Sequence, residues 1–265
     1  MSMKKSSVLL IGLLIVGYLS CQNEDIKTEK EQEASVSVFI QKELKILSDI
    51  LVPKNYKRDS VSQYGSWIRN LTLSKDNTVY YYNGEKKPNQ SIHIAVLDFD
   101  IGKRDLQQCA DACMRIRAEY LFEQKRFSEI TFLLASGKWK SFTDYTQKRD
   151  YKSFRKYLTY IFSYANTKSL KQQLKKVNSL RKIEIGDVFV QSGNPYGHAL
   201  TVMDVCVDTT GNKQFMLSQS YMPAQSIEIL INPNSPNSSP WYSADFEGDL
   251  ITPEWTFQKG DLRRF

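Results

Sequence analysis

The feature that most constrains the fold is a change of hydrophobic period near Ile185. Upstream of it, apolar side chains recur every three or four residues, the spacing of one helical face, and downstream they alternate, as along a half-buried strand. Helices are expected over residues 35–51, 104–125, 153–165 and 169–177, and strands near 187–192, 198–207, 214–220 and 226–230. The sequence therefore predicts one α+β domain, in which N-terminal helices pack on a C-terminal antiparallel sheet.

Further local patterns refine this domain. Residues 79–100 are expected to form a hairpin, because two β-rich runs flank a turn that contains Asn, Gly and Pro. The helix over 104–125 has the clearest apolar stripe, and Asp105 is expected to cap it. Its stripe consists of Leu106, Cys109, Cys113, Ile116 and Tyr120. Near the C-terminus, Trp241 and Trp255 are expected to pack back onto the domain.

The N-terminal residues have the pattern of an export signal. Lys4 and Lys5 precede an apolar run from Val8 to Val16, which is shorter than the roughly 20 residues that span a bilayer. Ser20 followed by Cys21 resembles a bacterial lipoprotein cleavage site, so Cys21 is the expected lipidation residue. An ordinary secretory signal followed by an incidental Cys is the alternative. The expected organisation is a signal peptide over 1–20, a polar tether over 21–35 and a single domain over 36–265.

The tether and the overall charge indicate where the protein is found. Glu24 and Asp25 resemble the surface-export signal of Bacteroidetes lipoproteins, so we expect an anchor in the outer membrane, with either orientation left open. The formal charge of +7 includes Lys4 and Lys5 of the signal, and the other positive charges are scattered. The expected partners are therefore the membrane, through lipidated Cys21, and peptidoglycan or an envelope glycan, but not nucleic acid.

Cysteine usage argues against a disulfide framework. Besides Cys21, the chain has Cys109, Cys113 and Cys206, an odd number without regular spacing. At least one free thiol is therefore expected outside the cytoplasm.

Three polar residues could form a catalytic group. Cys109 lies near the start of a predicted helix, where the helix dipole favours a thiolate, and His198 begins the strand after the turn GNPYG. Gln219 is expected on the same face of the neighbouring strand. In a symmetric hairpin, however, Gln219 opposes Val202, and a bulge or a sheared sheet would be needed to bring it to His198. A helix-borne Cys, a strand-borne His and an orienting polar group form a papain-type arrangement.

Each of these residues also has a purely structural interpretation. Cys109 is equally consistent with a small buried residue on the apolar stripe, and His198 with a residue that supports the turn. Gln219 could instead satisfy backbone groups. His93 has no other ligand type at metal-binding spacing and is expected to be an ordinary core or surface histidine.

The segment GDVFVQSGNPYGHALTVMDV, followed by LSQSYM, resembles the C-terminal half of papain-like cell-wall amidases and endopeptidases of the CHAP type. The resemblance implies a papain-like (CHAP-like) core. It assigns Cys109 as nucleophile, His198 as base and Gln219 as the orienting residue. The segment around Cys109 lacks the aromatic residues that are usual in that family, and the spacing from Cys109 to His198 is long.

A second resemblance covers residues 50–257. The motifs YGSWIRNL, DLQQCADA, RIRAEYL, GDVFVQ, QSYMPAQ and TPEWTF, in this order, resemble an uncharacterised bacterial family, domain of unknown function 4846. That family has no assigned activity, so this resemblance implies one intact exported domain and no particular reaction.

We therefore expect an exported, lipid-anchored cysteine hydrolase that cuts an amide bond in peptidoglycan or a peptide, without a cofactor or a metal. The alternative is a non-catalytic envelope module that binds a glycan or a partner protein through aromatic residues of SPWY and TPEWTF. The position of the Cys109 sulfur relative to the His198 ring, in or out of an open cleft, discriminates between them.

Overall fold

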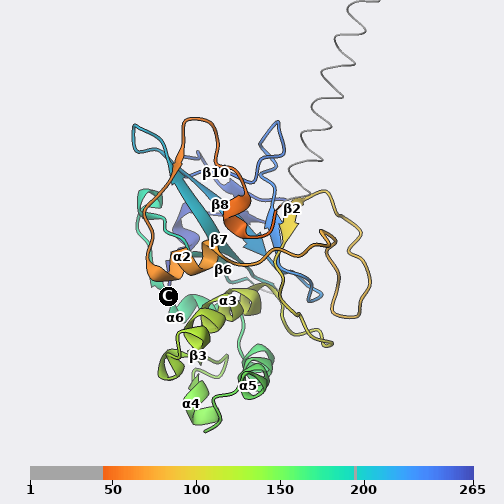
Figure 1. Cartoon of the computed structure of the whole chain (residues 1–265). Helices are drawn as coiled ribbons and strands as arrows, with labels where there is room; N and C mark the ends of the chain where they lie inside the picture. Colours follow the sequence, from red (N-terminus) through yellow and green to blue (C-terminus); the bar gives the residue numbers. More distant parts are fainter. Residues whose placement is uncertain (1–43, 194–195) are drawn as a thin grey trace, which may run out of the picture. The chain divides into compact units, whose positions relative to one another are not determined.

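The computed structural model describes residues 44–193 and 196–265 (Figure 1). Residues Lys45–Phe265 form one compact unit, which is described below. The expected signal peptide, the tether with Cys21 and most of the expected helix over 35–51 lie outside the described residues. Within them, no helix is long and apolar enough to cross a membrane.

One large antiparallel sheet forms the centre of this unit. Its strands run in the order β2–β9–β8–β7–β6–β13–β5, with β1 paired to β7 and β10 paired to β8. Their bounds are β1 Lys57–Arg58, β2 His93–Val96, β5 Lys175–Lys176, β6 Val188–Gln191, β7 His198–Val207, β8 Lys213–Gln219, β9 Glu228–Leu230, β10 Tyr242–Ser243 and β13 Leu262–Arg264. Two small hairpins lie outside it: β3 Thr131–Leu133 with β4 Trp139–Ser141, and β11 Leu250–Ile251 with β12 Thr256–Phe257.

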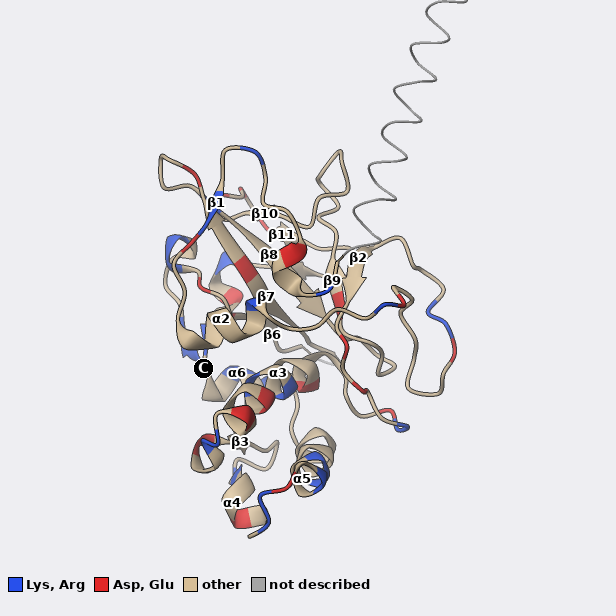
Figure 2. Ribbon diagram, in the orientation of Figure 1, with Lys and Arg blue, Asp and Glu red and all other residues tan. Residues whose placement is uncertain are grey.

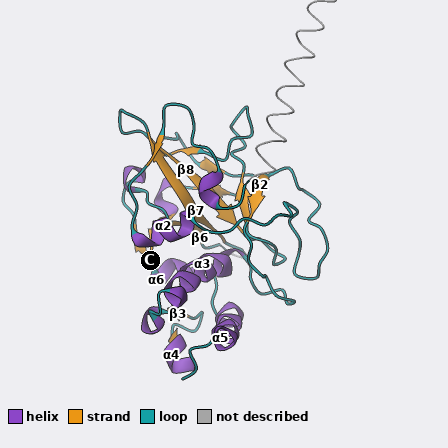
Figure 3. Cartoon of the chain, viewed as in Figure 1, coloured by secondary structure: helices purple, strands orange, loops and turns teal. Residues whose placement is uncertain are grey.

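The helices are α2 Gln63–Arg69, α3 Cys109–Glu123, α4 Phe142–Tyr145, α5 Tyr151–Tyr164 and α6 Thr167–Gln173. Short 3-10 turns occur at Leu47–Asp49, Phe127–Glu129, Leu180–Lys182 and Lys259–Asp261. Helices α3, α4 and α5 gather on one side of strands β6 to β8 (Figure 3). The expected α+β class, with a large antiparallel sheet and a few helices, is confirmed. Lys and Arg are spread over the helices, strands and loops (Figure 2).

Helix α3 differs from its prediction at its start and in its burial. It begins at Cys109, because the carboxylate of Asp105 accepts from the backbone N–H of Ala224 (2.7 Å) and from Gln108 Nε2 (3.0 Å) and does not cap the helix. The helix packs against β7 on one side and α5 on another, so it is buried almost all round. Even Arg115 is only 1% exposed and pairs with Glu119 in the same helix.

The hairpin expected over 79–100 is wrong. Strand β2 pairs with β9, more than a hundred residues away, and residues 79–91 form a loop that makes only isolated bridges, such as Tyr81 with Gln225. Turn residues are a local signal, whereas the partner of a strand such as β2 depends on side-chain packing across the whole sheet. This loop therefore lies beside β9 and brings Lys87 to the sheet.

The β7–β8 pair contains a register shift that determines how Gln219 lies relative to His198. Its register shifts between Val202 and Asp204, so that Leu217, and not Gln219, lies opposite Val202. The expected symmetric register is therefore wrong, and the bulge moves Gln219 closer to the start of β7. Asp204, which was expected on the face of His198, is turned to the other face and pairs with Arg58 (2.8 Å) and Arg69 (2.7 Å).

Both tryptophans near the C-terminus pack back onto the unit, as expected. Trp241 is 4% exposed, and its Nε1 donates to the backbone oxygen of Leu51. Trp255 lies in the turn of the β11–β12 hairpin and is half-buried beside the first residue of β7.

Candidate functional site

His198 is positioned by the glycine turn that precedes it. At Gly197 a Cβ atom would lie 2.2 Å from the backbone oxygen of Gln191, so only glycine allows the chain to pass here and enter β7. His198 is the first residue of β7, pairs with Gln191 of β6 and is 2% exposed. Its ring packs against Tyr221, Trp255 and Phe257, at 4.8, 5.4 and 5.9 Å between ring centres.

Burial determines the charge of the His198 ring. The loss of solvent lowers the pKa of His198 to about 4, although its hydrogen bond to Gln219 acts in the opposite direction. The ring is therefore neutral at pH 7 and carries one proton, on one of its two nitrogens.

Gln219 determines which nitrogen carries that proton. Its Oε1 lies 3.0 Å from His198 Nε2, while its Nε2 donates to Glu228 Oε1 (2.9 Å) and to Glu254 Oε2 (2.6 Å). Since a carboxylate oxygen can only accept, the amide nitrogen must face the two carboxylates, and the amide oxygen must face the ring. His198 consequently donates through Nε2, and its Nδ1 is unprotonated.

A buried charge cluster that the sequence did not reveal surrounds Gln219. Lys87, 4% exposed, donates to Glu228 (2.8 Å) and to Glu254 (2.7 Å). His93 Nδ1 lies 3.2 Å from Glu228 Oε2, and Gln225 Nε2 donates to Glu228 Oε1 (2.7 Å). Burial alone would raise the pKa of Glu228, but the neighbouring side chains of His93, Lys87 and Gln219 hold it below its ordinary value. Glu228 is therefore an ionised acceptor.

Two of these residues offered some signal in the sequence. A single Glu228 in the apolar run SIEILI is unusual for a buried strand, and in the sequence His93 lies in an alternating pattern with Ala95 and Leu97. His93 is a buried histidine, as one of the expected alternatives held, and its Nε2 bonds to the backbone oxygen of Asn77 (2.7 Å). Lys87, in the loop KKPNQ, had no such signal.

Cys109 is the first residue of α3 and lies against the backbone on either side of His198. Its thiol donates to the backbone oxygen of Gly197 (3.9 Å between sulfur and oxygen). The backbone N–H of Ala199, in contrast, stabilises the thiolate form. Among the described residues, no hydrogen bond joins this sulfur to the His198 ring. Burial, and then the carboxyl group of Asp111, raise the pKa of the Cys109 thiol to about 12, so the thiol is protonated at neutral pH.

Cys109 lines a surface hollow of about 220 Å³. The thiol is 4% exposed. The lining includes Gln108, Asp111, Tyr196, Gly197 and Met222. Asp111 is 7% exposed; its Oδ2 accepts from the backbone of Gln108, but its Oδ1 has no partner among the described residues. Burial raises the pKa of Asp111 well above its ordinary value. The thiol is thus at the wall of a small hollow with a mixed polar and apolar lining.

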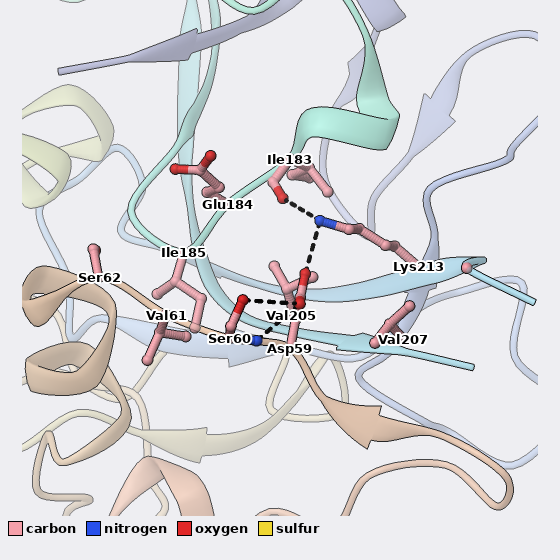
Figure 4. A pocket seen from close by; sticks show the side chains of 11 residues that line it. Asp59, Ser60, Val61, Ser62, Ile183, Glu184, Ile185, Val205, Val207 and Lys213 are labelled. Atoms are coloured by element: carbon pink, nitrogen blue, oxygen red, sulfur yellow. Dashed lines mark hydrogen bonds and ion pairs between the residues drawn. The ribbon is translucent and has the colours of Figure 1, made fainter. Parts of the chain in front are cut away.

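A larger hollow of about 580 Å³ lies elsewhere and contains none of these residues (Figure 4). Its main charged contacts are internal: Lys213 pairs with Asp59 (2.8 Å) and donates to the backbone oxygen of Ile183 (3.3 Å). No nucleophilic thiol or histidine lines it. The other two thiols of the described residues, Cys113 and Cys206, are free and buried.

Comparison with known proteins identifies a family but no reaction. A family model described as "domain of unknown function (4846)" matches residues 46–264, nearly the whole of the described region. No curated protein and no solved structure matches the chain.

Proposed function

Since the chain belongs to the family described as domain of unknown function 4846, we propose a function from the site alone: an exported papain-like cysteine hydrolase that cuts an amide bond in peptidoglycan or a peptide. Cys109 is the nucleophile, His198 the base and Gln219 the orienting residue, and lipidated Cys21 anchors the protein to the outer membrane. The observation that carries the proposal is the His198–Gln219 hydrogen bond, which leaves Nδ1 free on a neutral imidazole.

The reaction begins from a neutral thiol and a neutral imidazole. The Cys109 thiol turns from the Gly197 oxygen toward the ring, and its proton passes to His198 Nδ1 as the sulfur attacks the amide carbon. The C–N bond then breaks, and the leaving nitrogen takes the proton from Nδ1. Water adds to the thioester with the same base, and this releases the acid and restores the thiol.

Backbone N–H groups at the start of α3 stabilise the oxygen of the tetrahedral intermediate. The N–H groups of Cys109 and Ala110 lie close enough to the thiol to lower its pKa. As the N–H groups of the first residues of a helix, they have no partner within the helix and form the positive end of its dipole. An oxyanion formed on a carbonyl that the sulfur attacks lies within their reach.

The non-catalytic module is the second candidate, and one observation favours it: a thiol that is 4% exposed and bonded to Gly197 is also what a structural residue would show. The binding surface expected for that module is wrong in part. Trp241 and Tyr242 of SPWY are 4% and 2% exposed, so they cannot present aromatic faces to a glycan.

Thiol labelling separates the two candidates. The full chain is treated with iodoacetamide at pH 7, and each cysteine is quantified by peptide mass spectrometry in the wild type and in His198→Ala. The proposal predicts that Cys109 reacts faster than Cys113 and Cys206, and that this advantage is lost in His198→Ala. Equal, slow labelling of all three thiols in both proteins would support the non-catalytic module.

A further inference from the structure

We propose that Glu228, Glu254 and Lys87 are positioning residues that act on His198 through Gln219. They hold the Gln219 amide in one orientation and so fix the proton of His198 on Nε2. A contribution of this arrangement to catalysis rests on the proposed role of His198 as a base. Its effect on the position of the His198 ring proton rests only on the contacts described above.

The contacts exclude the reversed amide. If the Gln219 amide flipped, its oxygen would face the two carboxylate oxygens now 2.9 and 2.6 Å from its nitrogen, and no donor of Gln219 would meet them. The flipped nitrogen would also donate to His198 Nε2, which would move the ring proton to Nδ1 and remove the base. The carboxylates of Glu228 and Glu254, on one side of the Gln219 amide, thus determine which nitrogen of His198, on its other side, carries the proton.

Lys87 makes this cluster of acceptors possible. Two carboxylates that share one amide nitrogen repel each other, and burying the Glu228 carboxylate without a counter-charge is costly. The Lys87 ammonium bridges them, at 2.8 Å from Glu228 and 2.7 Å from Glu254. Three segments far apart in the sequence therefore meet at one amide: the loop over 79–91, strand β9 and the turn of the β11–β12 hairpin.

The turn of the β11–β12 hairpin also packs against the His198 ring. Trp255 follows Glu254 directly, packs 5.4 Å from the His198 ring and donates through Nε1 to Gln191 Oε1 (2.9 Å). Gln191 is the β6 residue paired with His198. One turn thus supplies both a carboxylate that orients Gln219 and an indole that excludes water from the imidazole.

The test uses the fact that the chain has only two histidines. The full chain is labelled with ¹⁵N-histidine, and the His198 signals are assigned by their loss in His198→Ala. The variant is Glu254→Gln, in which the new amide can accept or donate, so that only the Glu228 carboxylate still opposes the flipped Gln219. Its control is Glu129→Gln, which removes a carboxylate from an exposed ion pair with Arg126 elsewhere.

The wild type and Glu129→Gln are expected to show His198 protonated on Nε2 only. Glu254→Gln is expected to show a second set of His198 signals with a protonated Nδ1, and Cys109 labelling slower by about tenfold, the lower end of the effect of losing an outer partner of a metal-bound histidine. Gln219→Met, which removes the amide but leaves Lys87 paired with both carboxylates, is expected to give the same mixture of tautomers.

The outcomes separate this inference from the proposed function. An unchanged, pure Nε2–H ring in both Glu254→Gln and Gln219→Met would overturn the positioning role, whatever the thiol does. If the tautomer changes in these variants while wild-type Cys109 labels no faster than Cys113, the positioning role stands and the hydrolase proposal fails.

Discussion

At the scale of residues, the burial of His198 has a thermodynamic consequence. Its pKa falls from the ordinary 6.5 to about 4 in the folded protein, so the unfolded chain binds more protons between these values. Stability is therefore expected to fall as the pH falls from 6.5 to 4, by up to about 3 kcal/mol from this residue. Denaturant unfolding of the wild type and of His198→Gln at pH 7 and pH 4.5 measures this. If both proteins lose the same stability between the two pH values, His198 is not buried as a neutral ring.

Asp111 is expected to change the pH dependence of stability in the opposite direction. Its folded-state pKa is raised by burial, so the unfolded chain releases its proton first, and stability falls as the pH rises above the ordinary value of 3.8. Asp111→Asn keeps an oxygen for the Gln108 backbone and removes the group whose pKa is raised by folding, so it is expected to stabilise the protein at pH 7 by about 1 kcal/mol. Cys109 should also label faster, because the carboxyl group of Asp111 contributes to the raised pKa of the thiol. A less stable variant, or slower labelling, would contradict this account.

The sequence identified His198, Gln219 and Cys109 as candidates because residue type and strand alternation are local properties. It did not identify Glu228, Glu254 or Lys87 as their neighbours, since each comes from a different segment and their proximity depends on the sheet order. Lys87 illustrates the limit: a lysine in a polar loop is normally solvated, and here it is buried between two carboxylates.

At the scale of elements, the β11–β12 hairpin is expected to control the environment of His198. Trp255→Ala opens one side of the ring to water, so the pKa of His198 should rise from about 4 toward 6.5. The loss of a half-buried indole is also expected to cost about 2 kcal/mol of stability. NMR titration of His198 measures the pKa, with Trp139→Ala, an exposed tryptophan on β4, as the control. An unchanged pKa in Trp255→Ala would show that the indole does not shield the ring.

Periodicity predicted both ends of each of the strands β6 to β9 to within two residues, since it reads one face of each element. It failed for the segment over 79–100, because the partner of β2 is β9 and no local pattern specifies a partner so distant. It could not place the bulge in β7 that the His198–Gln219 contact requires, because no Gly or Pro marks it. That bulge is what brings Gln219 within reach of His198.

At the scale of the whole molecule, the account predicts an activity on the cell envelope. The full chain incubated with purified peptidoglycan fragments should release new amino groups, and Cys109→Ala should abolish this. Cys113→Ala, a change of similar size one turn along the same helix, is the control and should retain activity. Release by Cys109→Ala equal to that of the wild type would exclude Cys109 as the nucleophile.

The most direct measurement for the central claim is the pH dependence of Cys109 alkylation in the full chain. A thiol that transfers its proton to His198 keeps the same total number of protons, so wild-type labelling should be independent of pH from about 5 to 8 and should fall near pH 4, where His198 becomes protonated. In His198→Ala only the free thiolate reacts, so the rate should rise about tenfold per pH unit. A wild-type profile that rises with the same slope as His198→Ala, at the same rates, would contradict the claim that His198 is the base for Cys109.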